Sequence, residues 1–470
     1  MKPWNKAVVL LIGAAVFMSG CTPKSEKNIT ESTSAGITKA AYSSKTEEID
    51  AFLTENIPRT AFPSMSVTIV DKNDVLMSKS YGISGMEKKT HAVGSVSKSF
   101  TALCIMQLAE QGKLSLSDPL SLYLPSVTDA SKITILQLLN HTSGLGEHQN
   151  AGNCRIVGVQ GKHVYANVNY SLLGEVVEAV SGMSFEDYVT ANVIKPLGMD
   201  STFANPTEAV NKGLARGHSN WFGLKIPTGI QYSSSKNAWI TVPAGYICSS
   251  SSDLGRYLQM YLRGGEGIIS SDGIHSMFYD SVYVEDDIPY SYGMGWNVIK
   301  DTLSEPVIYH TGLVETGMAC TYILPESGIG VSFTVNANDY LIGTDLADRV
   351  GWAVVEILTG DKHGEIGEHE YFLRHLMFDA IYLAVLAVAV LSFVKVRSGK
   401  INTAVLILLH LILPVLLLIL LPVFLNTPLW VAKAFVPDMF TVIVISAALL
   451  FLSGIARVVF RKKKKAFEKN

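Results

Sequence analysis

The sequence predicts an α+β domain held between two terminal regions of membrane type. Three observations support this prediction: strand-type alternation near both ends of the middle region, amphipathic helical spacing between those strands, and apolar runs concentrated at the two ends of the chain. The chain has 470 residues, a net charge of −3 and a hydrophobic fraction of 48%. This length fits one large domain with an accessory region, and the near-neutral charge gives no indication of nucleic-acid binding.

The N-terminus has the pattern of an export signal. Two lysines precede an apolar run over residues 7–18, and small residues then lead to Cys21. Small residues before a cysteine also resemble a lipoprotein processing site, at which Cys21 would be lipidated. An uncleaved anchor and ordinary cleavage are the alternatives. We therefore expect residues 1–21 to form a signal or anchor, and residues 22–45, rich in Ser, Thr, Lys and Glu, to form a flexible tether.

The middle domain, predicted over residues 46–360, has strand patterns at both of its ends. Residues 66–70 and 75–78 alternate around a polar turn, which predicts one antiparallel hairpin. Residues 317–324 and 328–336 are β-rich runs around a second turn, which predicts another. A sheet built from both ends of the domain closes late in the chain.

Two amphipathic helices are predicted between these strands. Residues 100–111 have apolar side chains at helical spacing, and Gly112 ends the pattern. Residues 172–180 repeat the pattern, and Gly182 ends it. Strands at both ends with helices between them are typical of an α+β fold.

The C-terminal region holds three apolar stretches, over residues 377–394, 404–425 and 440–460. Each is long enough to cross a bilayer as a helix and nearly free of charge, which excludes ordinary core helices. We expect residues 361–376 to be a juxtamembrane segment and residues 377–470 to hold three membrane spans with a basic tail.

Basic flanks predict the orientation of these spans. Lysines and arginines follow the first and third spans, whereas the connection between the second and third carries only Lys433. Because basic flanks stay in the cytoplasm, the middle domain is expected outside a multi-pass cell-membrane region, with a cytoplasmic tail. The export pattern at the N-terminus predicts the same side.

Ser95 and Lys98 are the candidate nucleophile and base. Residues three apart share one face of a helix, so the amine can reach the hydroxyl. A lysine kept neutral by burial and the helix N-terminus can accept the serine proton. The same Ser-x-x-Lys spacing recurs at residues 233–236 and 392–395, but only Ser95 stands before a strong amphipathic helix.

The surrounding motifs resemble those of the serine β-lactamase and penicillin-binding-protein superfamily, in particular its class C β-lactamase-like branch. The resemblance covers roughly residues 47–360. It implies an antiparallel sheet flanked by helices, with an all-helical insertion, as in the β-lactamase/transpeptidase fold. The motifs that carry it are HAVGSVSKSF at 91–100, LLNHTSGL at 138–145, YANVNYSLLG at 165–174, PAGYICSSSSDL at 243–254, YGMGW at 292–296 and HTG at 310–312.

The resemblance implies roles for the residues around the serine. Ser95 would be acylated, and Lys98 would share its proton. Tyr165 would be a second base or proton relay, and Asn167 would orient Lys98 and the substrate amide.

The third element, His310-Thr311-Gly312, should line the cleft on a strand. Thr311 would bind a substrate carboxylate, and the backbone N–H groups of Ser95 and Leu313 would form the oxyanion hole. His310 replaces the lysine of efficient β-lactamases and is only partly charged near neutral pH, which favours peptidase, esterase or transferase activity.

Two further features follow from the resemblance. His141, in a His-Thr-Ser-Gly run, would belong to a structural turn and not to a catalytic pair; His148, His163 and His218 have no partner at useful spacing. The stretch from 145 to 165 is short for the superfamily and glycine-rich, which predicts an exposed loop and an open site.

The cysteines give no sign of a metal centre. None of the 5 forms a CxxC pair or a cluster with zinc spacing, so we expect neither metal nor cofactor. Buried thiols are the interpretation for three cysteines in apolar runs, with disulfides as the open alternative in an exported domain. These cysteines are Cys104, Cys248 and Cys320, with Cys154 the fourth possible disulfide partner.

These observations predict a membrane-bound, extracytoplasmic serine hydrolase that forms an acyl-enzyme. Its expected substrates are cell-wall peptides containing D-amino acids, or related amides and esters of the envelope. The alternatives are a true β-lactamase and a catalytically silent module that senses a ligand. The expected partners are a small-molecule or peptide substrate and membrane lipid, with no nucleic acid.

Overall fold

An antiparallel sheet forms the centre of the domain in the computed structural model, which describes residues 39–284, 290–397, 402–424 and 426–467. Its strand order is β2-β1-β12-β11-β10-β9-β8-β7. The strands are β1 Ser64–Asp71, β2 Val75–Gly82, β7 Val282–Tyr283, β8 Tyr290–Tyr292, β9 Asn297–Ile299, β10 Val307–Val314, β11 Gly317–Leu324 and β12 Ile329–Val335. Both predicted hairpins, β1–β2 and β11–β12, are confirmed.

The first strands of the domain pair with the last. β1 lies antiparallel to β12, with Met65 opposite Val335 and Asp71 opposite Ile329. The alternating apolar side chains of both strands are buried, so this pairing joins the two ends of the domain through one core. The sheet therefore closes late in the chain, as the sequence predicts.

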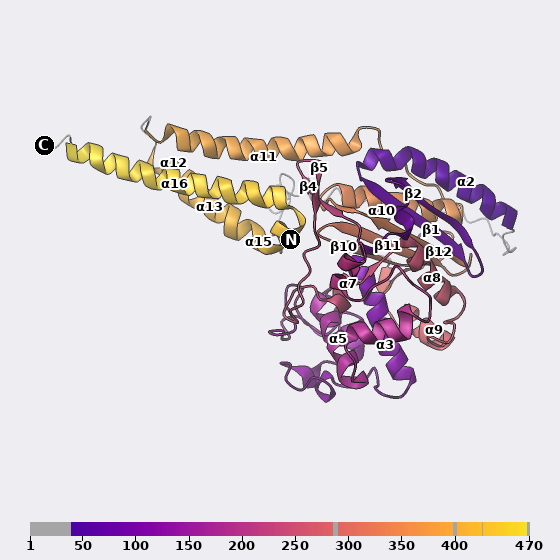
Figure 1. Ribbon diagram of the computed structural model, residues 1–470. Helices are drawn as coiled ribbons and strands as arrows, with labels where there is room; N and C mark the ends of the chain where they lie inside the picture. Colours follow the sequence, from indigo (N-terminus) through magenta and orange to yellow (C-terminus); the bar gives the residue numbers. More distant parts are fainter. Residues whose placement is uncertain (1–38, 285–289, 398–401, 425, 468–470) are drawn as a thin grey trace.

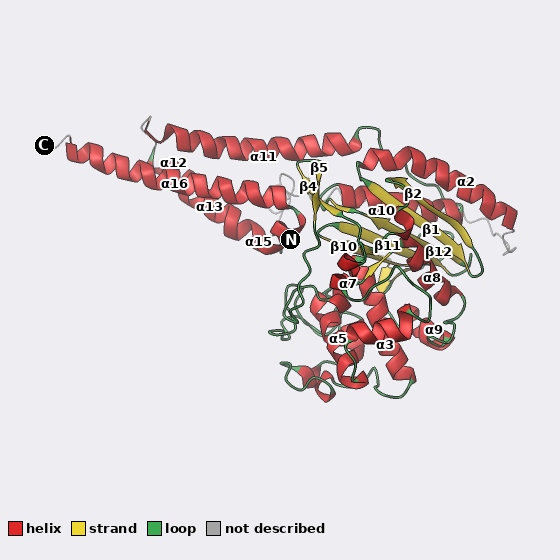
Figure 2. Ribbon diagram, viewed as in Figure 1, coloured by secondary structure: helices red, strands yellow, loops and turns green. Residues whose placement is uncertain are grey.

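Helices cover both faces of the sheet (Figure 2). On one face, α2 (Lys39–Asn56) and α10 (Gly343–Thr359) share a core with the strands. On the other face, α8 (Ser251–Leu262) packs with the helical insertion, whose central helices are α3 (Ser97–Glu110) and α5 (Asn167–Ser181). The predicted α+β class and the all-helical insertion are confirmed.

Short elements complete the domain. The helices among them are α4 Ile135–Leu139, α6 Phe185–Val189, α7 Pro206–Asn211 and α9 Ser271–Tyr279. Two small sheets join distant segments of the chain: β3 His91–Ala92 with β6 Cys248–Ser249, and β13 Ala337–Asn338 with β4 Gly217–Trp221 and β5 Leu224–Thr228.

The predicted tether needs a correction at its C-terminal end. Residues 39–45 belong to α2 and are therefore not flexible linker. This segment contains alanines and no helix breaker, so the helix that buries Ile49 and Leu53 extends backwards through it. The rest of the tether, the signal segment 1–21 and Cys21 lie outside the described residues.

Three apolar helical segments follow the domain and are long enough to cross a membrane. They are Glu370–Val394, Thr403–Leu420 and Pro437–Arg461, with mean hydropathies of 2.3, 2.9 and 2.4. The first is α11 (Glu370–Val394), and the third lies in α16 (Pro437–Phe467). The second contains α12 (Thr403–Ile407) and α13 (Leu413–Val415) and is followed directly by α14 (Leu421–Phe424). Figure 1 shows them projecting together from one side of the domain.

The second of these candidate spans is irregular, and the first begins earlier than the sequence predicts. Wider π-type turns, Leu408–Ile412 and Leu416–Leu420, flank Pro414, because proline lacks the N–H that a regular helix needs. Helix α11 starts at Glu370, so it includes part of the segment predicted to be juxtamembrane.

A buried polar group joins the domain to the first span. The Lys225 ammonium, on β5, lies 2.7 Å from the Asp339 carboxylate and donates to the Tyr371 hydroxyl at 2.6 Å. His375 Nε2 lies 2.8 Å from the same carboxylate. We call these four residues the junction cluster. Because Tyr371 and His375 lie on α11, the cluster fixes the start of this span against the domain.

Candidate active site

Ser95 lies in a single 3-10 turn, Gly94–Val96, directly before α3. The helix begins at Ser97, earlier than the predicted residue 100. Ser97 holds the turn, because its hydroxyl donates to the Gly94 carbonyl at 2.7 Å and accepts from the Ile247 N–H at 3.0 Å. Ser95 is partly exposed, as a nucleophile must be.

Lys98 is fully buried and contacts three oxygens. Its Nζ lies 2.9 Å from Ser95 Oγ, 2.8 Å from Asn167 Oδ1 and 2.6 Å from the Ala244 carbonyl oxygen. The amide and carbonyl oxygens can only accept, so they take two N–H groups of the amine. In a neutral amine, the lone pair is then left for the serine hydroxyl.

Burial also favours the neutral amine. It lowers the pKa of Lys98 well below the ordinary lysine value of 10.5. The three oxygens that Lys98 contacts are all uncharged, so none of them stabilises the ammonium as a carboxylate would. The arrangement suits a general base acting on Ser95.

Tyr165 stands beside this pair. The centre of its ring lies 4.9 Å from Lys98 Nζ. Burial raises the pKa of its phenol, and hydrogen bonding with Ser95 works in the opposite direction. Tyr165 is therefore placed to pass a proton between Ser95 and a leaving group.

Strand β10 forms the opposite side of the site. Its pairing with β9 ends at Tyr309, and beyond that point its edge lies against the Gly94–Val96 turn. A methyl group at Gly312 would lie 2.0 Å from the Val93 carbonyl oxygen and 2.7 Å from the Ser95 nitrogen. Only glycine permits this approach of strand and serine turn.

The same contact brings two backbone nitrogens together. Gly94 has a φ of +56°, and a methyl group there would lie 2.3 Å from the Leu313 nitrogen. The N–H groups of Ser95 and Leu313 therefore belong to neighbouring backbone segments, as an oxyanion hole requires. Thr311, two residues before Leu313 on the same strand, is partly exposed.

His310 is buried and has two hydrogen-bond partners. Its Nδ1 lies 2.7 Å from the Thr311 carbonyl oxygen, which can only accept, so Nδ1 carries the proton. Its Nε2 then accepts from the Tyr292 hydroxyl at 3.2 Å. Burial, and to a lesser extent the proximity of the Lys98 amine, lowers the pKa of His310 to about 3. The sequence suggests partial charge, whereas this environment keeps His310 neutral.

Sequence reasoning missed two members of the site, Ala244 and Tyr292. Both lie in motifs that carried the resemblance, Pro-Ala-Gly-Tyr and Tyr-Gly-Met-Gly-Trp. The first acts through a backbone carbonyl, which leaves no side-chain signal. The second acts through a histidine that is distant in sequence.

The other histidines are placed differently. His141 is buried with a φ of +56°, and its Nδ1 contacts Asn169 Nδ2 at 2.8 Å, which fits a structural turn. His163, predicted to have no partner, packs its ring 5.5 Å from that of Tyr292. His148 and His218 contact the carbonyl oxygens of Asn426 and Asn336.

The described cysteines are all free and buried, so the open alternative of disulfides among them is not realised. They are Cys104, Cys154, Cys248 and Cys320. Burial raises the pKa of the Cys104 and Cys248 thiols, which keeps both protonated.

The fold and this set of residues are those of the serine β-lactamase and penicillin-binding-protein superfamily. The chain belongs to the β-lactamase family, whose pattern it matches over residues 47–351. It is 26% identical over 324 residues to protein flp of Staphylococcus aureus strain MW2, covering 62% of this chain and 63% of that protein. The chain thus spans less than two thirds of the length of this relative.

Solved structures share the fold. A penicillin-binding protein homologue from Pyrococcus abyssi, described as octameric, has a TM-score of 0.59 and 27% identity, covering 67% of this chain and 78% of the other. A class C β-lactamase has a TM-score of 0.58 and 20% identity, covering 68% and 98%.

Proposed function

We propose that this protein is a membrane-bound, extracytoplasmic serine hydrolase that forms an acyl-enzyme on Ser95. The observation that carries the proposal is the environment of Lys98, a buried amine whose two hydrogen-bond acceptors leave its lone pair for the Ser95 hydroxyl. Family membership supports the same chemistry.

The proposed reaction has two halves. In the first, Ser95 Oγ bonds to the substrate carbonyl carbon while its proton passes to Lys98, and the carbonyl electron pair moves to the oxygen beside the Ser95 and Leu313 N–H groups. The C–N or C–O bond then breaks, and the leaving amine or alcohol takes a proton through Tyr165. In the second half, water attacks the acyl-enzyme, gives its proton to the same base, and releases Ser95 and an acid.

The environment of His310 favours amide or ester hydrolysis over efficient β-lactam hydrolysis. A neutral imidazole held by Tyr292 attracts a β-lactam carboxylate more weakly than the lysine of efficient β-lactamases. We therefore propose D-amino-acid peptides of the cell wall, or related envelope amides and esters, as substrates. A true β-lactamase is the second candidate.

The arrangement of charge supports the proposed orientation. Lys395 and Arg397 follow the first span, and Arg457, which lies near the end of the third, donates to the Ser392 carbonyl at 2.9 Å. Basic residues thus gather at the end of the span bundle opposite the domain (Figure 1). This end is expected in the cytoplasm.

Covalent labelling tests the proposal. The full chain in phospholipid nanodiscs should form an adduct with a fluorescent penicillin or a fluorophosphonate, and Ser95→Ala should lower the rate by about a thousandfold or more. No adduct with either reagent in folded protein would favour the silent sensing module. Hydrolysis rates for a cephalosporin, a D-Ala-D-Ala peptide and a p-nitrophenyl ester then separate β-lactamase, peptidase and esterase.

A further inference from the structure

Two loops lead into the candidate active site, and we take them as one wall of the cleft that the resemblance implies. The 145–164 loop leads directly into Tyr165, and the 229–241 loop leads into the turn whose Ala244 carbonyl binds Lys98. The loops touch, because a methyl group at Gly152 would lie 2.0 Å from Asn237 Oδ1. Their positions are therefore coupled to each other.

Both loops rest on the connection between the second and third spans, residues 426–436. Trp239 meets Trp430 edge to face, with ring centres 4.9 Å apart. On the other loop, His148 Nε2 lies 2.7 Å from the Asn426 carbonyl oxygen. Trp430 lies on α15 (Leu429–Phe435), the short helix between the two spans. One wall of the cleft is thus attached to the point where two spans end.

The opposite wall is attached to the third span as well. The turn after β10 is held by β4, where Ser219 donates to the Glu315 carbonyl at 3.2 Å. The next residue on β4, Asn220, donates to the Asp438 carboxylate at 3.2 Å, and the Phe222 N–H does so at 3.0 Å. Asp438 lies in the first turn of α16. Both walls therefore contact residues at the domain-facing ends of the second and third spans.

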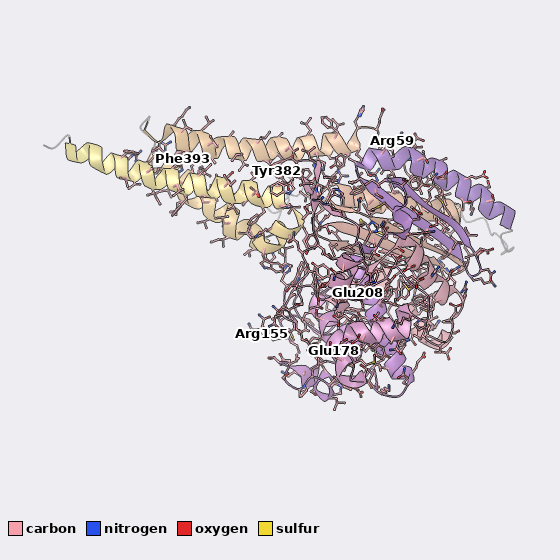
Figure 3. All side chains as sticks on the ribbon, viewed as in Figure 1. Arg59, Arg155, Glu178, Glu208, Tyr382 and Phe393 are labelled. Carbon is pink, nitrogen blue, oxygen red and sulfur yellow. The ribbon has the colours of Figure 1, made fainter. Side chains whose placement is uncertain are left out.

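The 145–164 loop presents apolar and basic side chains to solvent. Val157 and Val159 are 60% and 71% exposed. Arg155 and Lys162, on either side of them, are exposed too. Figure 3 places Arg155 on the side of the domain from which the spans project. Exposed apolar residues flanked by cations are typical of segments that lie at a bilayer interface.

We propose that the cleft takes its substrate from the outer leaflet of the membrane, so that the acyl donor is a lipid-anchored molecule. Its head group enters the cleft from the bilayer surface while its lipid tail stays in the bilayer. This inference rests on the proposed function of Ser95 and adds the substrate class. Confinement to one surface raises the effective concentration of head groups at the cleft.

Three fluorophosphonates that differ only in their attachment provide the test. One is soluble, one is joined to a diacyl lipid by a short linker, and one is joined to the same lipid by a long linker. With each, Ser95 Oγ bonds to phosphorus, the P–F bond breaks, and fluoride leaves as the serine proton passes to Lys98. The full chain in anionic phospholipid nanodiscs should react with the short-linked lipid reagent about tenfold faster than with the soluble one.

Comparing the two linker lengths shows how far the cleft lies above the bilayer surface. A cleft at the surface reacts with the short-linked reagent at least as fast as with the long-linked one. Labelling only by the soluble and long-linked reagents overturns the inference and leaves the proposed function standing. Labelling by none of the three, in folded protein, overturns the proposed function itself.

Substitutions distinguish the contribution of the 145–164 loop to membrane contact from the chemistry at Ser95. Val159→Asp should lower the short-linked rate by about tenfold, because a carboxylate is repelled by anionic lipid, and should leave the soluble rate unchanged. Trp430→Ala, which removes a contact outside the site, should have the same selective effect. Val75→Asp is the matched control, since Val75 is 58% exposed at the start of β2, outside both loops and outside the apolar helices. A short-linked rate unchanged in both variants overturns the inference.

Discussion

Among the described residues, two lysines with buried side chains have similar neighbours but differ in one charged partner. Lys98 in the candidate active site and Lys225 in the junction cluster each lie near a histidine and near a tyrosine ring, at 4.9 and 4.7 Å. The difference is Asp339, whose carboxylate lies 2.7 Å from Lys225, whereas Lys98 hydrogen-bonds only uncharged oxygens.

This one carboxylate changes what the lysine can do. Burial alone would raise the pKa of Asp339, but His375 and Lys225 together lower it to about 2, so the carboxylate stays ionised. Burial lowers the pKa of Lys225, but the ionised Asp339 carboxylate opposes this and holds Lys225 as an ammonium in a structural ion pair. Lys98 has no such partner and can serve as a base. The same residue types therefore form a clamp in one place and a reactive site in the other.

The largest expected effect comes from removing the amine of Lys98. Lys98→Met should lower the rate of Ser95 labelling by about a thousandfold, because the serine loses its base. The same change should raise the free energy of unfolding by about 1 kcal/mol, since a buried amine without a counter-ion is replaced by an apolar side chain. Stopped-flow labelling and thermal unfolding measure the two effects. A Lys98→Met variant that loses stability would contradict the view that this lysine is present for chemistry.

Removing the counter-ion of Lys225 should have the opposite effects: a loss of stability with little change in the labelling rate. Asp339→Asn should lower the free energy of unfolding by about 3 kcal/mol, because it leaves a buried ammonium without its partner. Labelling of Ser95 by the soluble reagent, measured well below the unfolding temperature, should change little. Lys225→Met/Asp339→Leu, which removes both charges, is the matched control and should be more stable than Asp339→Asn.

The pH dependence sharpens the comparison further. Labelling requires neutral Lys98, so its rate should fall as pH drops through the lowered pKa of that amine and should be level across a pH range in which an ordinary lysine is still charged. An ordinary lysine would give a rate still rising near pH 10. His310, with a pKa of about 3, should add no step in this range.

The ion pair should respond only to strong acid. Asp339 has its pKa lowered in the fold, so its contribution to stability is fully present above the ordinary value of 3.8 and is lost as pH falls through about 2. Unfolding measured from pH 2 to 5 in protein and in Asp339→Asn should converge at the acid end. If the free energies of unfolding of the two proteins stayed a constant distance apart from pH 5 to pH 2, the Asp339 carboxylate would not be ionised in the fold.

The smallest expected effect concerns the hydroxyl that holds His310. Tyr292→Phe removes the donor to His310 Nε2 and should lower kcat/KM for an ester substrate by about fivefold, the value of one hydrogen bond. Tyr371→Phe, in the junction cluster, is the matched control and should leave kcat/KM unchanged.

Much of the fold could be predicted because its signals are local. Strand alternation at residues 66–70 and 317–324 and helical spacing after Phe100 follow from which side chains face a core. The three apolar stretches predict spans by length alone. The helix α2 was not predicted, and its first residues were assigned to the tether, because a polar stretch rich in Ser and Lys has no apolar period to mark a helix.

The sequence by itself determined the chemistry that is available: the i, i+3 spacing of Ser95 and Lys98, the order of the motifs, and the length of the spans. Only the tertiary structure decided which lysine is a base, because the Ala244 carbonyl and the Asp339 carboxylate reach their lysines across 146 and 114 residues of chain. Only it brought both walls of the cleft to the ends of the spans. The physical reason is that burial and charge set the state of an amine, and both depend on which distant segments fold against it.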